Sequence, residues 1–86
     1  MKTIRMLIEN RRSEKMLVFI EPEAMDYWLN PKNQCELISE ASDDGQLDVQ
    51  QTDEGLTVFP EKGAGSILVI QSGVELECGH KRPDNW

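Results

Sequence analysis

The chain has 86 residues, a formal net charge of −7 at pH 7, and 38% hydrophobic and 29% charged residues. This length fits one domain with a single modest core, and the composition does not indicate disorder. No segment reaches the roughly 20 apolar residues of a membrane span, and the first eight residues lack the apolar stretch of a signal peptide. We therefore expect a single domain over residues 1–86, cytoplasmic and without a membrane partner, in which 81–86 form a short C-terminal tail.

The charges are distributed unevenly along the chain. Residues 1–15 carry five Lys or Arg and two Glu, whereas residues 16–80 carry two Lys and thirteen Asp or Glu. An acidic body repels the phosphates of nucleic acids, so no nucleic-acid partner is predicted. Two interpretations stay open: the acids keep a small domain soluble, or they attract a basic partner protein.

The first candidate strands lie in the N-terminal third of the chain. Residues 3–9 form one, and the polar segment 10–14 separates it from the continuous apolar run 16–20. Such a run with β-branched residues is typical of a central strand covered on both faces. In residues 21–30, Pro22 could start a short helix, but the aromatic pair Tyr27 and Trp28 favours a strand that ends at Pro31.

The middle of the chain contains three further candidate strands. Residues 34–41 form one, with either Cys35 and Leu37 or Glu36 and Ile38 facing inward. Residues 47–50 alternate apolar and polar, as a strand with one wet face does, and residues 56–59 follow. The segments 43–45 and 53–55 each end in glycine and predict hairpin turns, because glycine accepts the positive φ of tight turns.

The C-terminal part continues the same pattern. Residues 60–66 form a Gly-rich loop without phosphate-loop spacing, and the apolar run 67–70 predicts a second central strand covered on both faces. A third predicted hairpin turn, 71–73, leads to an alternating strand in which Val74, Leu76 and Cys78 face the core. Together these elements predict an all-β fold: a small antiparallel β-sandwich or flattened barrel of about six to eight strands.

Three short motifs carry a resemblance. They are Ile20-Glu21-Pro22, Tyr27-Trp28-Leu29-Asn30-Pro31 and Glu77-Cys78-Gly79-His80-Lys81-Arg82-Pro83. The chain resembles short uncharacterised bacterial hypothetical proteins that share this pattern. The resemblance implies a compact β-rich fold and no particular active site.

Metal and thiol chemistry depends on three residues, Cys35, Cys78 and His80. One histidine excludes sites with two or three histidine ligands, and close-spaced cysteine pairs typical of structural zinc are absent. Cys78 and His80 share a face if their strand continues, which would allow an activated thiolate. An inward-facing Cys78 would be an inert core thiol instead. We expect no cofactor and no enzymatic activity, and keep a metal or small-molecule site on these three residues as the alternative function.

The favoured function is a non-enzymatic protein-binding module, comparable to inhibitors or immunity proteins that meet a basic partner. Trp28 beside acids would be a suitable contact residue, and a C-terminal Trp86 could dock on the domain or engage another subunit, so a homo-oligomer is also considered. The predicted partner-binding residues are Trp28, Asp43, Asp44, Asp48, Asp53, Glu54 and Trp86.

Overall fold

The computed structural model describes residues 1–76, and these residues form strands and turns only. No helix in this part of the chain could span a membrane. The strands are β1 (Lys2–Glu9), β2 (Met16–Ile20), β3 (Met25–Leu29), β4 (Gln34–Ala41), β5 (Gln46–Gln51), β6 (Gly55–Glu61), β7 (Ala64–Gln71) and β8 (Val74–Glu75).

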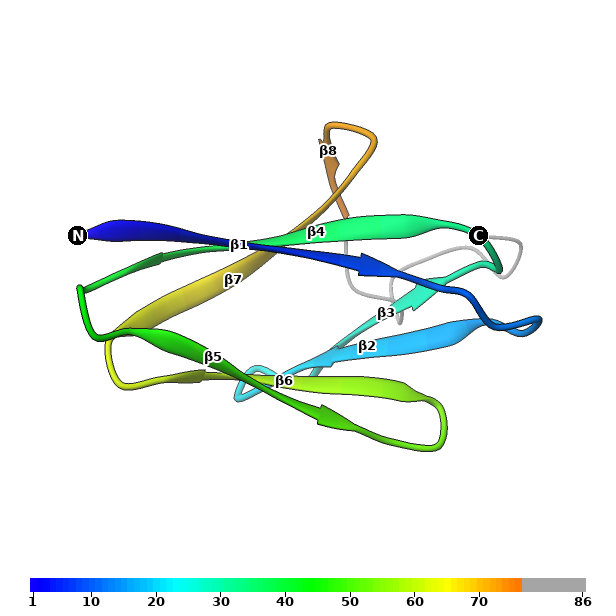
Figure 1. The fold of residues 1–86 in the computed structure, drawn as a ribbon, viewed down its shortest axis with the longest axis horizontal. Coiled ribbons are helices and arrows are strands. Elements are labelled where there is room, and N and C mark those ends of the chain that lie inside the picture. The colour runs from blue at the N-terminus through cyan, green and yellow to red at the C-terminus, as the bar shows by residue number, and fades with distance from the viewer. Residues whose placement is uncertain (77–86) are drawn as a thin grey trace.

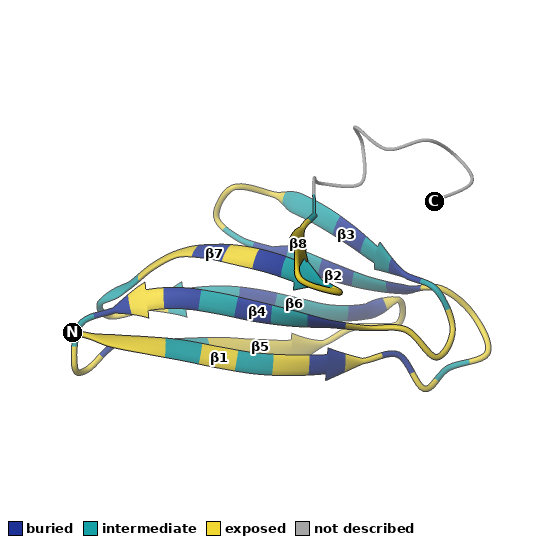
Figure 2. Cartoon of the chain, turned by 90° about the horizontal axis from the view of Figure 1, so that it is seen from above, coloured by how far each residue is buried: buried dark blue, intermediate teal, exposed yellow. Residues whose placement is uncertain are grey.

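The strands form two four-stranded sheets that pack face to face (Figure 1). The first sheet has the order β1-β4-β7-β8 and the second has the order β3-β2-β6-β5. This arrangement confirms the predicted all-β sandwich. Alternate residues of each long strand point between the sheets, which is why buried and open positions alternate along the ribbons in Figure 2.

The core between the sheets is built from aliphatic side chains of both layers. Val18, Leu29 and Val58 of the second sheet and Leu37 of the first are completely buried. Burying a side chain of this size contributes about 1.5–3 kcal/mol relative to leaving it in water. In β4 the inward residues are Cys35 and Leu37, so the structure decides between the two faces that the sequence left open.

The second sheet contains one parallel pair, whereas only antiparallel pairs were expected. β2 and β6 run side by side in the same direction, with Val18 opposite Leu56 and Ile20 opposite Val58. Between these two strands the chain forms β3, crosses to the first sheet as β4 and returns as β5. Parallel neighbours require such a long connection, because a two-residue hairpin reverses the chain direction.

Two of the three predicted hairpin turns are confirmed and one is wrong. Residues 53–55 join β5 to β6 within one sheet, and Ser72 and Gly73, both with positive φ, join β7 to β8. Residues 43–45 instead connect β4 of the first sheet to β5 of the second, so this turn is a corner of the sandwich. A glycine-containing turn has the same local chemistry in both settings, which explains the error.

The segment 21–30 is a turn followed by a strand. Residues 21–24 form the turn, in which Ala24 has φ of 58°, and Met25–Leu29 pair with β2 along its whole length. The predicted strand at Tyr27 and Trp28 is confirmed, and a helix starting at Pro22 is not formed. Tyr27 is buried and Trp28 is half-buried, as adjacent residues of a strand must point to opposite faces.

Two apolar segments are less covered than predicted. In β7 the side chain of Leu68 is 44% exposed, so the prediction that both faces of 67–70 are covered is wrong. Val74 is 63% exposed although Leu76, at the same parity, packs against the core. β8 has two residues and belongs to a hairpin that projects from the sandwich in Figure 1, so no strand of the second sheet lies over Val74.

Candidate interaction surface

The five predicted acidic contact residues do not form one cluster. Asp43 and Asp44 lie at the corner between β4 and β5, Asp48 lies within β5, and Asp53 and Glu54 lie at the turn after it. A six-residue strand is about 17–20 Å long, so β5 separates the two ends of this set. The acids therefore define a line along one edge of the second sheet rather than a single patch.

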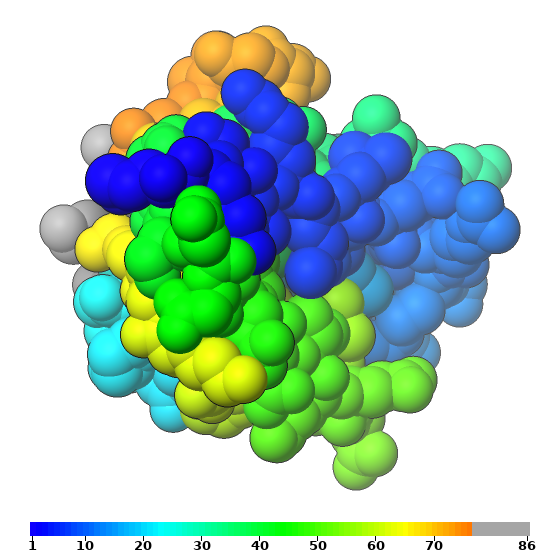
Figure 3. All heavy atoms as spheres, turned by 60° about the vertical axis from the view of Figure 1, so that its left-hand side comes forward, coloured from blue at the N-terminus to red at the C-terminus, as the bar shows by residue number. Residues whose placement is uncertain are grey.

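Part of this acidic charge is already matched within the molecule. The N-terminal ammonium lies 3.5 Å from Asp43 Oδ1, and Lys2 Nζ donates to the Asp43 carbonyl oxygen at 2.9 Å. Figure 3 shows this end of the sandwich, where the start of the chain lies beside the corner that follows β4. At the other end, Asp53 lines a hollow together with Arg11 and Arg12. There the guanidinium groups of Arg11 and Arg12 pair with Glu9 and Glu14, so only the first end offers clearly less uncompensated negative charge than the sequence suggested.

Trp28 lies on the outward face of the second sheet, in a group of large apolar side chains. Strand register places Leu17 directly opposite Trp28, and Phe19 is next along β2 on the same face. Phe59 of β6 also points outward, because its neighbour Val58 points into the core. We call these four half-buried residues, Leu17, Phe19, Trp28 and Phe59, the aromatic face.

The polar residues around the aromatic face are acidic. Asp26 is opposite Phe19, and Asp48 is opposite Phe59. Glu61 lies two residues beyond Phe59 on β6, and the Trp28 indole Nε1 donates to Asp26 Oδ2 at 3.0 Å. None of the four described strands of the second sheet contains Lys or Arg. Within these strands the charged side chains beside the aromatic face are therefore all acidic.

Sequence reasoning identified Trp28 and Asp48 on this face but missed Leu17, Phe19 and Phe59. The run 16–20 was interpreted as covered on both faces, so its odd-numbered residues were assigned to the interior. The parity of Leu17 and Phe19 was visible in the sequence. Their meeting with Trp28 and Phe59 depends on the pairing of β2 with β3 and β6, which local periodicity does not reveal.

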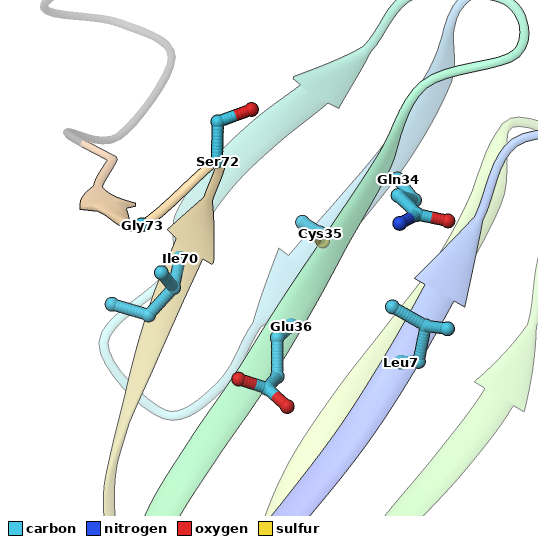
Figure 4. Close-up of a pocket in the computed structure, with 7 residues that line it drawn as sticks. All are labelled: Leu7, Gln34, Cys35, Glu36, Ile70, Ser72 and Gly73. Atoms are coloured by element: carbon cyan, nitrogen blue, oxygen red, sulfur yellow. The ribbon is translucent and has the colours of Figure 1, made fainter.

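The outward face of the first sheet is more mixed. Ile38 and Leu68 are opposite each other, as are Glu36 and Ile70. Figure 4 shows a shallow hollow on this sheet, with Leu7 and Ile70 on either side of β4 and with Ser72 and Gly73 at its upper end. The Arg5 guanidinium pairs with Glu36 at 3.2 Å across β1 and β4. Because this face carries charges of both signs, it does not favour a partner of either charge.

Cys35 lines the floor of that hollow, but its thiol is not available for chemistry. The residue is 2% exposed, and burial raises the pKa of its thiol to about 11. A thiol with this pKa stays protonated at neutral pH, and the thiolate is the reactive and metal-binding form. Cys35 is therefore a core residue in the part of the chain that the structure describes.

The remaining candidates for metal binding and for contact, Cys78, His80 and Trp86, lie outside the described residues. Within residues 1–76 no group of three or more His, Cys, Asp or Glu side chains is placed to hold a metal ion.

Comparisons of the chain with protein-family models, with curated proteins and with solved structures found no match.

Proposed function

We propose that this protein is a non-enzymatic binding module that holds a basic partner protein on the aromatic face. Its mode of action would be that of an inhibitor or immunity protein, which works by occupying a surface of its partner. The acidic body makes nucleic acid an unsuitable ligand, because phosphates and carboxylates repel each other.

One observation carries this proposal: three of the five aromatic residues of the chain lie together on the outward face of the second sheet, and acidic residues lie beside them. Phe19, Trp28 and Phe59 lie on this outward face, and Asp26, Asp48 and Glu61 are the charged residues within its strands. Interface centres are enriched in aromatic residues and their rims in charges. Negative charge around such a centre speeds encounter with a positively charged surface.

The rigidity of the face supports the same role. Both central strands of the second sheet, β2 and β6, are paired on each side, and their inward residues Val18, Ile20 and Val58 are completely buried. A preformed surface loses little conformational freedom on binding, which favours affinity. The Trp28 indole is also oriented in advance by its hydrogen bond to Asp26.

The test uses immobilised wild-type protein to capture proteins from a lysate of the producing cells, followed by mass spectrometry. A captured protein is then purified, and its affinity for Phe59→Ala and for Asp48→Lys is measured. We expect a basic partner whose binding weakens about 10-fold or more for Phe59→Ala, because a central aromatic contact is lost. For Asp48→Lys we expect slower association and a smaller dependence on salt.

The matched controls lie on the first sheet. Leu68→Ala removes an outward apolar side chain there, and Glu40→Lys reverses an outward acid. Both should leave the affinity within about twofold, since neither touches the aromatic face. If the controls weaken binding as much as the two test variants do, or if the captured protein is acidic, the proposal is wrong.

A further inference from the structure

Within residues 1–76 the two sheets of the sandwich have four edge strands, and β1 is the longest of them. β8 has two residues, β3 has five residues between Pro22 and Pro31, and β5 has six residues whose one charge, Asp48, is acidic and would face an acid in a pair of identical strands centred on it. Short length, proline and like charges brought opposite each other keep edge strands from pairing with other chains, whereas opposite charges favour pairing. β1 has eight residues without proline and pairs with β4 in unbroken register.

The backbone N–H and carbonyl groups of β1 that do not bond to β4 belong to its odd-numbered residues. The Asn10 N–H donates to the Asn33 carbonyl at 2.8 Å, and the Asn10 carbonyl accepts from the Lys32 N–H at 2.9 Å. Backbone groups in an antiparallel ladder alternate in direction, so Ile8, Met6 and Ile4 also bond toward β4. The N–H and carbonyl groups of the odd residues then point away from the sheet, and Figure 2 shows β1 along one margin of the molecule.

The side chains of the same odd residues form a self-complementary row. They are Thr3, Arg5, Leu7 and Glu9, all exposed and all on the outward face of the first sheet. Leu7 lies midway between Arg5 and Glu9 and is 64% exposed. If two such rows run antiparallel with Leu7 opposite Leu7, each Arg5 lies opposite a Glu9 of the other copy.

We propose that two copies of this chain associate through β1, with Leu7 on the two-fold axis and Arg5 opposite Glu9 of the second copy. The pairing joins both first sheets into one continuous sheet, because residues of equal parity stay on the same face. It uses backbone groups that β4 does not use, and a two-fold interface repeats each favourable contact twice. The inference concerns the first sheet and is independent of the proposed binding at the aromatic face.

The charges needed for this pairing are exposed and remain available. Arg5 contacts Glu36 at 3.2 Å, and Glu9 contacts Arg11 at 2.7 Å, within the chain. The Arg5 side chain is 61% exposed, and a guanidinium has five N–H donors, so it can contact two carboxylates at once. If the two-fold axis lay at Arg5 instead of Leu7, Arg5 of one copy would be opposite Arg5 of the other. Repulsion between these like charges disfavours that register.

Charge reversal on the two sides of the pair gives the decisive experiment. Arg5→Glu alone places Glu opposite Glu in the dimer, and Glu9→Arg alone places Arg opposite Arg. Mixing the two variants restores Glu opposite Arg at both positions. By sedimentation equilibrium we expect a wild-type dimer at about 100 µM, dissociation constants raised about 10-fold or more for each variant alone, and a heterodimer of near wild-type affinity in the mixture.

A proline substitution tests the backbone part of the pairing. Leu7→Pro removes an N–H that points away from β4, so the fold is kept, since edge strands accept proline at such positions. We expect a folded monomer with an unchanged melting temperature within about 3 °C. The matched control Met6→Pro removes an N–H that points toward β4 and should lower the melting temperature.

Several results would overturn the proposal. A wild-type protein that is monomeric at these concentrations is one of them. A dimer that persists in Leu7→Pro is another, and so is a mixture of the charge variants that stays monomeric while both variants are folded by circular dichroism.

Discussion

Among individual residues, Asn10 shows how one polar side chain fixes a loop. It is completely buried, and its Nδ2 donates to the carbonyl oxygens of Glu14 and Leu29, each at 2.9 Å. Its Oδ1 accepts from the Arg12 backbone N–H at 2.9 Å. The segment 10–14, which the sequence marked only as a polar separator, is thereby attached to the end of β3.

We expect Asn10→Ala to lower the free energy of unfolding by about 2–4 kcal/mol, because buried carbonyl and N–H groups lose their partners. Urea denaturation followed by tryptophan fluorescence measures the change. Asn33→Ala, at an exposed asparagine of the facing turn, is the control and should cost less than about 0.5 kcal/mol. Equal stability of the two variants would contradict the role of Asn10.

The buried thiol of Cys35 predicts an alkaline loss of stability. Burial raises its pKa from 9.0 to about 11 in the folded state. Between these values the thiol ionises in the unfolded chain but not in the folded one, so the free energy of unfolding falls as the pH rises. The loss is absent below pH 9 and reaches about 2–3 kcal/mol near pH 11.

Other groups titrate in this range too, so the measurement compares wild type with Cys35→Ala by urea denaturation from pH 8 to 11. Between pH 8 and 11 we expect the free energy of unfolding of Cys35→Ala to fall by about 2–3 kcal/mol less than that of the wild type. If both proteins lose stability in parallel as the pH rises, the Cys35 thiol is not the cause.

At the level of the strands, Gly55 is the residue that allows β6 to lie beside β2. A Cβ built at this position would collide with the backbone carbonyl of Leu17, directly opposite in the parallel pair. The Leu17 N–H also donates to the Glu54 carbonyl at 2.8 Å, which holds the start of β6 close. The predicted turn glycine therefore has a second role that the sequence does not show.

We expect Gly55→Ala to destabilise the protein by about 2–4 kcal/mol, because backbone atoms must separate to admit the methyl group. Thermal unfolding by circular dichroism measures the effect. Thr57→Ala, two residues further on the same face of β6, is the control and should change the stability by about 1 kcal/mol or less. An unchanged melting temperature for Gly55→Ala would show that the two strands are not this close.

Across the part of the molecule that the structure describes, basic residues occur in the strands of the first sheet and not in those of the second. The basic residues of the first fifteen positions lie on β1 and the loop after it, whereas the strands of the second sheet contain acids but no Lys or Arg. Binding of a basic protein to the aromatic face and pairing of two copies through β1 would use opposite layers of the sandwich. The two kinds of association are therefore compatible in one complex.

The sequence by itself determined which segments become strands and, for most of them, which residues share a face. Period-two alternation reports this directly, because successive side chains of a strand point to opposite sides. The strand at Tyr27 and Trp28 and the turns at 53–55 and 71–73 followed from such local signals. The sequence also placed Trp28 and Asp48 among the contact candidates.

Only the tertiary structure decided which strands are neighbours and which faces are covered. The pattern of apolar and polar residues does not show whether the outward face of a strand is covered by another layer or exposed to water. Leu68 and Phe19, which lie in continuous apolar runs, were therefore assigned to the interior. The corner at 43–45, the parallel pairing of β2 with β6 and the assembly of the aromatic face depend on contacts between residues far apart in the chain. Such pairings are selected by how the whole core packs, and no local pattern of residues encodes that choice.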